Sequence, residues 1–297
     1  MAQMAPVHAY HAPATLEECL ALLERNAGRV VVLAGGQSIL PLLKTRGIRP
    51  EVLLDLGRVP ELRAQSVTVD TGGVLEVGAM RRHRDLWTDP MIARDWSALA
   101  DAAWCVGDRQ VQSRGTLGGN LVFGTVITDM KQVAMCLDAE LVIVGSGGER
   151  TVSACDIFAD PAQMLLEPNE LLKAVRFPSV GSRGGSAYKK YGLTANGRPI
   201  IGVAARVKID EDRRCTEARI VVGGLVPCPH VASGAAESLI GKVVNEDVLA
   251  AAADAAAAEV RPQSDGRASA AFRRRLVRAY TGRSLSLAFK RAQEGGQ

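Results

Sequence analysis

Two short glycine-rich segments hold the residues best suited to binding chemistry. The first glycine segment, residues 34–38, reads Ala-Gly-Gly-Gln-Ser, and the second glycine segment, residues 116–120, reads Thr-Leu-Gly-Gly-Asn. Glycine lacks the Cβ atom that keeps a ligand away from the backbone, so several N–H groups of such a segment can reach one anion. Two segments of this kind in one chain predict a diphosphate that is held from both sides.

The first glycine segment lies between a β-branched run and a helical pattern. Ser38 could cap that helix and also donate to a phosphate oxygen at the positive end of the helix. The alternative is a tight turn between a strand and a helix that binds nothing. The segment has neither the G-x-x-x-x-G-K-[ST] spacing of a nucleotide-hydrolysing phosphate loop nor the G-x-G-x-x-G fingerprint of a Rossmann fold, which argues against both.

The second glycine segment is followed by an acidic residue at the predicted start of a helix. Asp129 stands nine residues after Asn120. Two roles are open for this carboxylate. It could cap the N-terminus of the helix, or it could accept hydrogen bonds from a ribose, as acidic residues do in other dinucleotide sites.

The composition argues against several other classes of function. The 36 basic and 32 acidic residues give a net charge of +4 and form no stripe interleaved with aromatics, so no nucleic-acid partner is expected. The six cysteines include no C-x-x-C pair, so we expect no metal site in this chain. No paired carboxylates or Ser/His/Asp set indicates a catalytic acid or base. We expect surface or structural roles for the four histidines, which lie outside both glycine segments: His8, His11, His83 and His230.

The chain shows no signal for export or for the membrane. Residues 1–13 lack a charged start and a long apolar core, and no stretch approaches the roughly 20 apolar residues of a membrane span. Unpaired cysteines are typical of a reducing compartment. We therefore expect a cytoplasmic protein without a membrane span.

Secondary-structure signals divide the chain into three predicted domains, 1–57, 58–178 and 179–297. A flexible composition at 178–185 predicts the last boundary. Strands are predicted at 30–33, 52–56, 67–69, 74–77, 141–144, 151–153, 187–191, 200–209 and 218–222, and helices from Thr15 to about Gly28, at 39–44, 129–137, 248–259 and 268–278. A turn at Gly72-Gly73 would join the strands at 67–69 and 74–77. Trp87, Trp96 and Trp104 fall in a further helical region, where core packing or a subunit contact is expected.

Taken together, these motifs resemble one family. Residues 34–41 with 53–56, and residues 114–121 with Asp129, are similar to the FAD-binding medium subunit of molybdenum hydroxylases. That family includes bacterial carbon monoxide dehydrogenases and the flavin domains of xanthine dehydrogenases. The similarity covers nearly the whole chain and extends to four further motifs: 169–172, 188–190, 262–265 and 272–273.

The resemblance implies an α+β fold. A two-subdomain FAD-binding domain of the PCMH type would be followed by a C-terminal α+β domain with an antiparallel sheet and helices. FAD would be bound non-covalently. The resemblance assigns no catalytic residue and no metal ligand to this chain.

The resemblance also implies which residues contact FAD. The first loop would cradle the diphosphate through its backbone amides: Val32, Leu33, Ala34, Gly35, Gly36, Gln37, Ser38, Ile39 and Leu40. The second loop would grip the diphosphate from the other side: Thr116, Leu117, Gly118, Gly119 and Asn120. Asp129 would bind the ADP half, Leu172 would make an apolar contact, and Val106 falls where relatives place a bulky apolar residue. The family lysine matches either Lys189 or Lys190.

The sequence departs from the family in two places. Many relatives carry a Pro-Ala-Ala-Asp-like run before the acid, whereas residues 126–129 here read Val-Ile-Thr-Asp. Residues 192–199 also lack an acidic-aromatic pair that some relatives have there. These regions lie near the flavin ring in the family, so the ring contacts and the electron acceptor stay open.

The implied function is that of an electron-transfer subunit. Substrate would be hydroxylated at a molybdopterin cofactor in a large partner subunit, and electrons would cross [2Fe–2S] clusters in a small partner subunit to reach FAD here. The assembly would be a dimer of heterotrimers. Two alternatives are a self-contained flavoprotein oxidase or dehydrogenase, which would need its own substrate pocket, and a non-catalytic nucleotide-binding protein.

Overall fold

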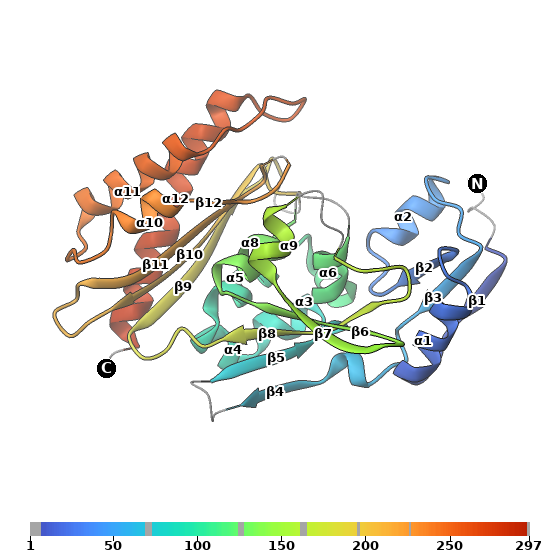
Figure 1. Cartoon of the computed structure of the whole chain (residues 1–297). Helices are drawn as coiled ribbons and strands as arrows, with labels where there is room; N and C mark the ends of the chain where they lie inside the picture. Colours follow the sequence, from blue (N-terminus) through green and yellow to red (C-terminus); the bar gives the residue numbers. More distant parts are fainter. Residues whose placement is uncertain are drawn as a thin grey trace.

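The computed structural model describes residues 7–68, 73–123, 128–160, 165–194, 197–225 and 227–295. Its three sheets follow one another along the chain, with strand orders β1-β3-β2, β4-β5-β8-β6-β7 and β12-β11-β10-β9. Figure 1 shows them as neighbouring layers, with the N-terminal unit in blue beside the middle sheet and the C-terminal sheet on the other side. The predicted mixture of helices and antiparallel sheets is confirmed.

The N-terminal unit is the small α/β unit that the sequence predicts. Its elements are β1 (Ala9–His11), α1 (Leu16–Arg25), β2 (Val30–Leu33), α2 (Ile39–Lys44) and β3 (Val52–Asp55). Thr15 caps α1, because its hydroxyl accepts a hydrogen bond from the Glu18 N–H at 3.2 Å. Both β1 and β2 pair in parallel with β3. The first glycine segment follows directly after the C-terminal end of β2.

The middle unit is an antiparallel sheet covered by short helices. Its strands are β4 (Gln65–Thr68), β5 (Val74–Gly78), β6 (Glu140–Gly145), β7 (Gly148–Ser153) and β8 (Leu171–Pro178). Its helices are η1 (Glu61–Arg63), α3 (His83–Thr88), α4 (Pro90–Asp95), α5 (Ser97–Cys105), α6 (Arg109–Arg114), α7 (Leu117–Val122), α8 (Met130–Cys136) and α9 (Ala154–Ala159). The predicted hairpin of β4 and β5 is confirmed, but Gly72 of its turn lies outside the described residues.

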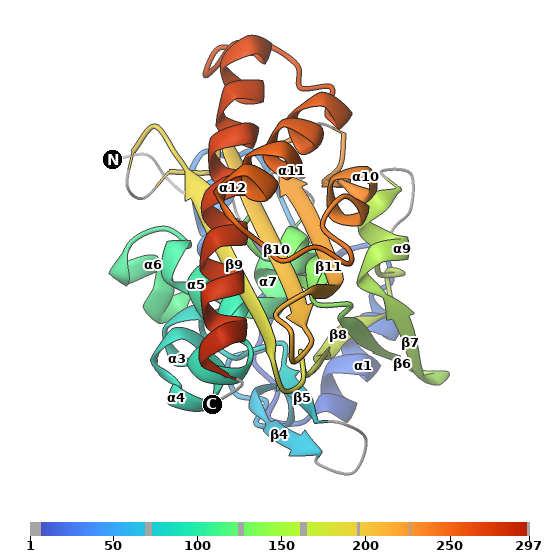
Figure 2. The ribbon, with the colours of Figure 1, turned by 90° about the vertical axis from the view of Figure 1, so that its left-hand side faces the viewer.

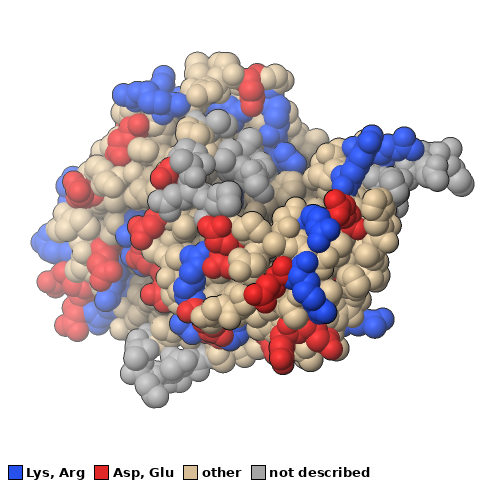
Figure 3. Space-filling view, turned by 45° about the vertical axis from the view of Figure 1, so that its right-hand side comes forward, with Lys and Arg blue, Asp and Glu red and all other residues tan. Residues whose placement is uncertain are grey.

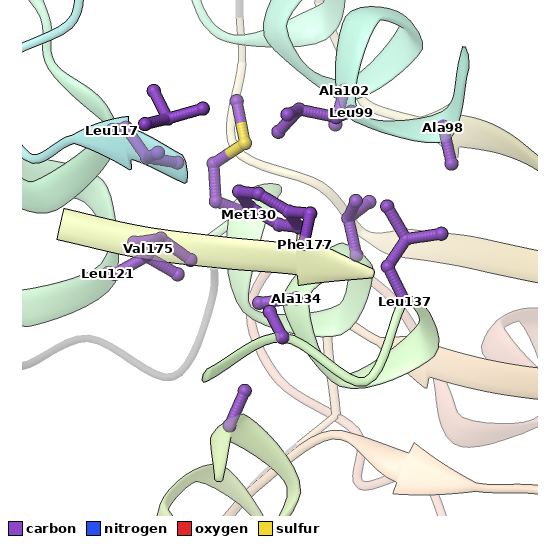
Figure 4. Close-up of a cluster of buried hydrophobic side chains, with 14 of the residues drawn as sticks. Ala98, Leu99, Ala102, Leu117, Leu121, Met130, Ala134, Leu137, Val175 and Phe177 are labelled. Atoms are coloured by element: carbon purple, nitrogen blue, oxygen red, sulfur yellow. The ribbon is translucent and has the colours of Figure 1, made fainter. Parts of the chain in front are cut away.

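A single apolar core holds these helices on the sheet. Figure 4 shows Leu117 and Leu121 of α7, Met130 of α8, and Val175 and Phe177 of β8 pointing toward one another. Each of these side chains is almost completely buried. Burying apolar surface on this scale fixes α7 and α8, the two helices whose first residues the sequence assigns to the site.

The three tryptophans lie in the helical region of the middle unit, as predicted, with Trp87 in α3, Trp104 in α5 and Trp96 at the bend between α4 and α5, but their environments differ. Trp96 is buried, and its indole N–H donates to the Phe177 carbonyl oxygen at 3.0 Å. Trp87 and Trp104 meet edge to face, with ring centroids 4.8 Å apart. Trp104 stays 50% exposed, so core packing describes Trp96 but not Trp104.

The C-terminal unit is an antiparallel sheet with helices on its outer face, as Figure 2 shows. Its elements are β9 (Gly184–Tyr191), β10 (Ile201–Ile209), β11 (Cys215–Gly223), β12 (His230–Val231), α10 (Ser233–Glu237), α11 (Glu246–Glu259) and α12 (Ala270–Glu294). The inner face belongs to the core of the middle unit, to which it contributes Tyr188, Ala204 and Val221.

Helix α12 is longer than the sequence predicts. The expected end near Arg278 is wrong, because the helix continues to Glu294. The second half of the helix buries Leu285, Ala288 and Phe289 against the sheet, and this packing stabilises it. The polar, arginine-rich sequence of this stretch does not predict such packing.

The end of α12 is anchored to the middle unit by one bidentate ion pair. Both terminal nitrogens of Arg291 donate to the Asp101 carboxylate of α5, at 2.7 and 3.0 Å. Arg291 also donates to the Ser186 carbonyl oxygen at 2.7 Å, and Asp101 accepts the Tyr188 N–H at 3.0 Å. The pair is largely shielded from solvent, so it ties α12, β9 and α5 together.

We predict that Arg291→Ala lowers the free energy of unfolding by about 2 kcal/mol, less than a fully buried pair because the side chains are partly exposed. Arg291→Lys should recover only part of the loss, since an ammonium group cannot make the two-pronged contact. Urea denaturation measures both. The neighbouring Lys290→Ala is the control, because its pair with Glu294 is exposed. Equal losses for Arg291→Ala and Lys290→Ala would contradict the anchoring role.

Candidate functional site

The two glycine segments approach the same place through their backbones. A Cβ atom on Gly35 would overlap the Arg114 carbonyl oxygen and would lie 2.8 Å from the Gly115 Cα atom. No side chain other than hydrogen fits between these two stretches of backbone. The first glycine segment therefore packs directly against the residues that lead into the second.

Both segments line one cleft of about 560 Å³, within the range of small-molecule sites. The walls come from all three units of the chain. Beyond the glycine segments they include the end of β5, the start of β8 and residues 197–199, which precede β10. Figure 3 shows that basic and acidic side chains are interspersed on one face of the molecule, so this face carries no broad patch of a single sign.

The first glycine segment turns its backbone toward the cleft. Gly36 has φ +74°, a conformation that favours glycine. The described part of the chain offers no acceptor to the N–H groups of Gly36, Gln37 and Ser38, which line the cleft. Ser38 occupies the N-cap position of α2, but its side chain makes no capping hydrogen bond, so the predicted capping role is wrong.

The second glycine segment is expected to be a loop, and this expectation is wrong. It forms the N-cap and first turn of α7. The Thr116 hydroxyl accepts the Gly119 N–H at 3.2 Å and so starts the helix. Gly118 lies against the end of β5, since its N–H donates to the Ala79 carbonyl oxygen at 2.8 Å and a Cβ atom would lie 2.6 Å from the Ala79 Cβ atom. This close approach explains the glycine at position 118.

Asp129 begins α8, as predicted, but its side chain does not cap the helix. One carboxylate oxygen accepts the Tyr188 hydroxyl at 2.7 Å, and the other accepts the Lys190 Nζ at 3.1 Å. Asn120 fills the capping role instead, because its side-chain oxygen accepts the Met130 N–H at 3.3 Å. Burial raises the pKa of Asp129, while Lys190 and Tyr188 oppose that rise.

The two candidate lysines point to opposite faces of β9. Lys190 is buried with Asp129, and its Nζ also donates to the Cys105 carbonyl oxygen at 2.6 Å. Lys189 instead lines a groove with Arg278 of α12, on the other side of the sheet. The alternation of side chains along a strand causes this separation. Neither lysine lines the cleft, although Lys190 holds a residue that does.

The remaining predicted residues fall into two groups. Most of them line the cleft: Val32, Ala34, Gly35, Gly36, Gln37, Ser38, Ile39, Val106, Thr116, Gly118, Gly119, Asn120, Asp129 and Leu172. Three leucines do not line the cleft, because their side chains pack in apolar clusters. Leu33 and Leu40 belong to a cluster of the N-terminal unit, and Leu117 belongs to the core of the middle unit.

Other lining residues are not among those that the sequence assigns to the site. They include Val31, Leu56, Ala79, Met80, His83, Gly107, Val111, Gly115, Val122, Phe123, Thr128, Leu166, Leu171, Gly197, Arg198 and Pro199. Six of them lie one or two residues after the end of a strand or helix, where only the fold decides which wall they join: Leu56, Ala79, Met80, Gly107, Gly115 and Phe123. Arg198 lies within residues 192–199, where the sequence departs from the family.

His83 lies in the wall of the cleft, away from the surface. It packs beside Gly115, and its Nδ1 is buried without a hydrogen-bond partner among the described residues. Burial lowers the pKa of His83 to about 4, so the ring is neutral at neutral pH. The Thr128 hydroxyl is also buried at the cleft without a partner in the described part of the chain.

Two other kinds of site are absent from the described residues. They contain no group of three or more histidine, cysteine or acidic side chains close enough to hold a metal ion. Within the same ranges, no helix is both long enough and apolar enough to cross a membrane.

We predict that His83 makes the fold sensitive to mild acid. Its pKa falls from 6.5 in the unfolded chain to about 4 in the folded one, so the unfolded chain takes up the proton first as the pH falls. Stability should therefore drop by roughly 3 kcal/mol between pH 6.5 and pH 4 from this group alone. Urea denaturation at both pH values should show a smaller drop for His83→Gln. An unchanged drop in that variant would assign the acid sensitivity to other groups.

Comparison with known proteins identifies the family. Residues 3–180 match the FAD binding domain in molybdopterin dehydrogenase, and residues 186–288 match the CO dehydrogenase flavoprotein C-terminal domain. The chain is 32% identical to the carbon monoxide dehydrogenase medium chain of Hydrogenophaga pseudoflava over 96% of this chain and 98% of that protein. It is 30% identical to the xanthine dehydrogenase FAD-binding subunit of Escherichia coli O157:H7 over 97% of each.

Solved structures have the same architecture. A carbon monoxide dehydrogenase from Hydrogenophaga pseudoflava superposes with a TM-score of 0.89 at 32% identity, covering 97% of this chain and 99% of that one. Quinoline 2-oxidoreductase from Pseudomonas putida 86 gives 0.88 at 32% identity, covering 99% and 100%. The expected FAD-binding domain with a C-terminal α+β domain is confirmed. The chain belongs to the FAD-binding medium subunits of the molybdenum hydroxylases and is thus a subunit of an oxidoreductase.

Proposed function

We propose that this chain binds FAD non-covalently in the cleft and passes electrons from the [2Fe–2S] clusters of a small partner subunit to an external acceptor. The observation that carries this proposal is the meeting of the two glycine segments at one cleft. The flavin, when bound, supplies the electron-accepting and electron-donating chemistry. The chain's own task is to hold and orient it.

The walls of the cleft fit a diphosphate. The N–H groups of Gly36, Gln37 and Ser38 lack acceptors among the described residues, and phosphate oxygens are acceptors of the kind that such groups bind. On the facing side, Gly118 and Gly119 line the cleft without side chains, while their N–H groups are already bonded to the Ala79 carbonyl oxygen and the Thr116 hydroxyl. We therefore assign the diphosphate to the space between the two segments.

Asp129 supports the assignment of the ribose. A carboxylate has about four acceptor positions, and Tyr188 and Lys190 use one on each oxygen. Ribose hydroxyl groups can donate to the positions left open. Because Lys190 is buried beside Asp129, it keeps the carboxylate charged and in place. The apolar side chains of Val106 and Leu172 provide surface for an aromatic ring system.

The residues of this chain indicate which cofactors belong to its partner subunits. Its relatives are named medium chains or subunits. All six cysteines are free thiols, and the described residues contain no cluster of three or more side chains that could hold a metal ion. We therefore assign the [2Fe–2S] clusters to the small partner and molybdopterin to the large partner. We propose a cytoplasmic dimer of heterotrimers. Within this chain, we propose domains at 1–57, 58–178 and 179–297, each with its own sheet.

We predict that Gly119→Val removes FAD. A Cβ atom at this position would lie 2.8 Å from the Thr116 hydroxyl oxygen, so the side chain would displace the cap of α7 and fill space next to the diphosphate. Affinity should fall roughly a hundredfold, about 2.7 kcal/mol, measured by FAD titration of the apoprotein. Gly147→Val is the control, because nothing lies within 4 Å of that position. A folded Gly119→Val protein with full flavin content would contradict the assignment.

We also predict which chains accompany this protein. Affinity purification of the tagged chain from its own cells should bring down a molybdopterin-containing large chain and a chain with two [2Fe–2S] clusters. Metal analysis and cluster absorbance identify them. A flavin-loaded chain that is purified alone and is bleached by a small substrate would instead favour a self-contained oxidase.

A further inference from the structure

The cleft wall at residues 197–199 is held from behind by two arginines that lie far along the chain. The Arg267 side chain donates to the Arg198 carbonyl oxygen at 2.7 Å. The Arg273 side chain donates to the Ile200 carbonyl oxygen, also at 2.7 Å. Two arginines of the C-terminal helical region thus fix the chain at residues 198 and 200, just before β10.

Arg273 is the more deeply buried of the two, with 3% of its surface exposed. One of its terminal nitrogens also donates to the Gly224 carbonyl oxygen at 3.2 Å, and the other donates to the Asp265 carboxylate at 2.7 Å. Gly224 has φ +80°, and a Cβ atom there would lie 2.6 Å from the Ile200 carbonyl oxygen. Arg273 therefore joins the residue before β10 to the residue after β11, at a point where the two backbones lie close together.

Asp265 organises both arginines. Its carboxylate accepts the backbone N–H groups of Arg267 and Ala268, each at 2.9 Å, as well as the Arg273 side chain. These contacts, first the Arg267 N–H and then the Arg273 guanidinium, lower the pKa of Asp265 to about 2. The carboxylate is therefore ionised at neutral pH and keeps the two arginines in a fixed relation.

The stretch that they hold carries the positive charge of the cleft. Among the described residues that line it, Arg198 is the only lysine or arginine. Its side chain is exposed and has no ion-pair partner in the described part of the chain. A diphosphate carries negative charge, so this guanidinium is the side chain in the walls that would attract it most strongly.

We propose that Asp265, Arg267 and Arg273 are positioning residues that hold the Arg198 guanidinium in the wall of the cleft, where it contacts bound FAD, so that the C-terminal unit completes the cofactor site. This inference rests on the proposed function. A purely structural clamp would alter stability without altering cofactor affinity, which separates the two roles.

The first test is FAD titration of the apoprotein. Arg198→Ala should weaken binding about tenfold, the loss of one charge-assisted contact. Arg267→Ala should weaken binding about fivefold while the melting temperature stays within about 2 °C, since it removes one exposed hydrogen bond. Arg267→Lys should recover most of the affinity. Arg278→Ala is the control, because it removes an exposed arginine that pairs with Asp254 on the outer helices.

The decisive test is a double-mutant cycle. If Arg267 acts by placing the Arg198 guanidinium, Arg267→Ala should have almost no further effect in an Arg198→Ala background. Full additivity, or unchanged affinity in Arg267→Ala, would overturn the inference while leaving FAD binding itself intact. A wild-type chain that takes up no FAD would instead defeat the proposed function.

Arg273→Lys provides a second test that does not depend on Arg267. A lysine keeps the charge but cannot reach both carbonyl oxygens and Asp265 together. Affinity for FAD should fall, and the visible circular dichroism of the bound flavin should change, because the wall shifts. A variant that is less stable but has the wild-type affinity and spectrum would show that Arg273 is structural only.

Discussion

The approach of Gly35 to the backbone of Arg114 and Gly115 is the contact on which the site depends. At this point two segments from different units meet without a side chain between them. Any larger residue would force the two segments apart, because its Cβ atom would lie 2.2 Å from the Arg114 carbonyl oxygen. The cleft exists because this separation is absent, and its two glycine-lined walls face each other for the same reason.

A second constraint joins the middle and C-terminal units. The buried Asp129 belongs to α8, whereas Tyr188 and Lys190, which satisfy its carboxylate, belong to β9. A buried charge without a partner is strongly destabilising, so the two units cannot separate at low cost. The network also gives the site a fixed acceptor group at its edge. Stability and ligand geometry are thus set by the same few hydrogen bonds.

The sequence predicts the parts of this site that depend on residue type alone. Paired glycines beside small polar residues identify both segments, and β2, α2 and α8 lie where the sequence predicts them, whereas helix α7 at the second segment is not predicted. What depends on three-dimensional packing is not accessible in that way. The choice between Lys189 and Lys190 depends on which face of β9 each side chain occupies. The burial of His83 depends on the elements packed around it. The hydrogen bond from Arg267 to residue 198 joins positions 69 apart in the chain.

The adjacent lysines of β9 have a consequence for strand register. A slip of one residue exchanges the two faces of a strand. Such a slip usually destabilises the misaligned strand, because it buries side chains that belong on the exposed face. Here such a slip would still present an ammonium group to Asp129, because Lys189 would replace Lys190. Electrostatics alone therefore cannot distinguish the native alignment from its nearest competitor. That discrimination falls to Tyr188, whose hydroxyl and ring have no equivalent at position 187 or 189.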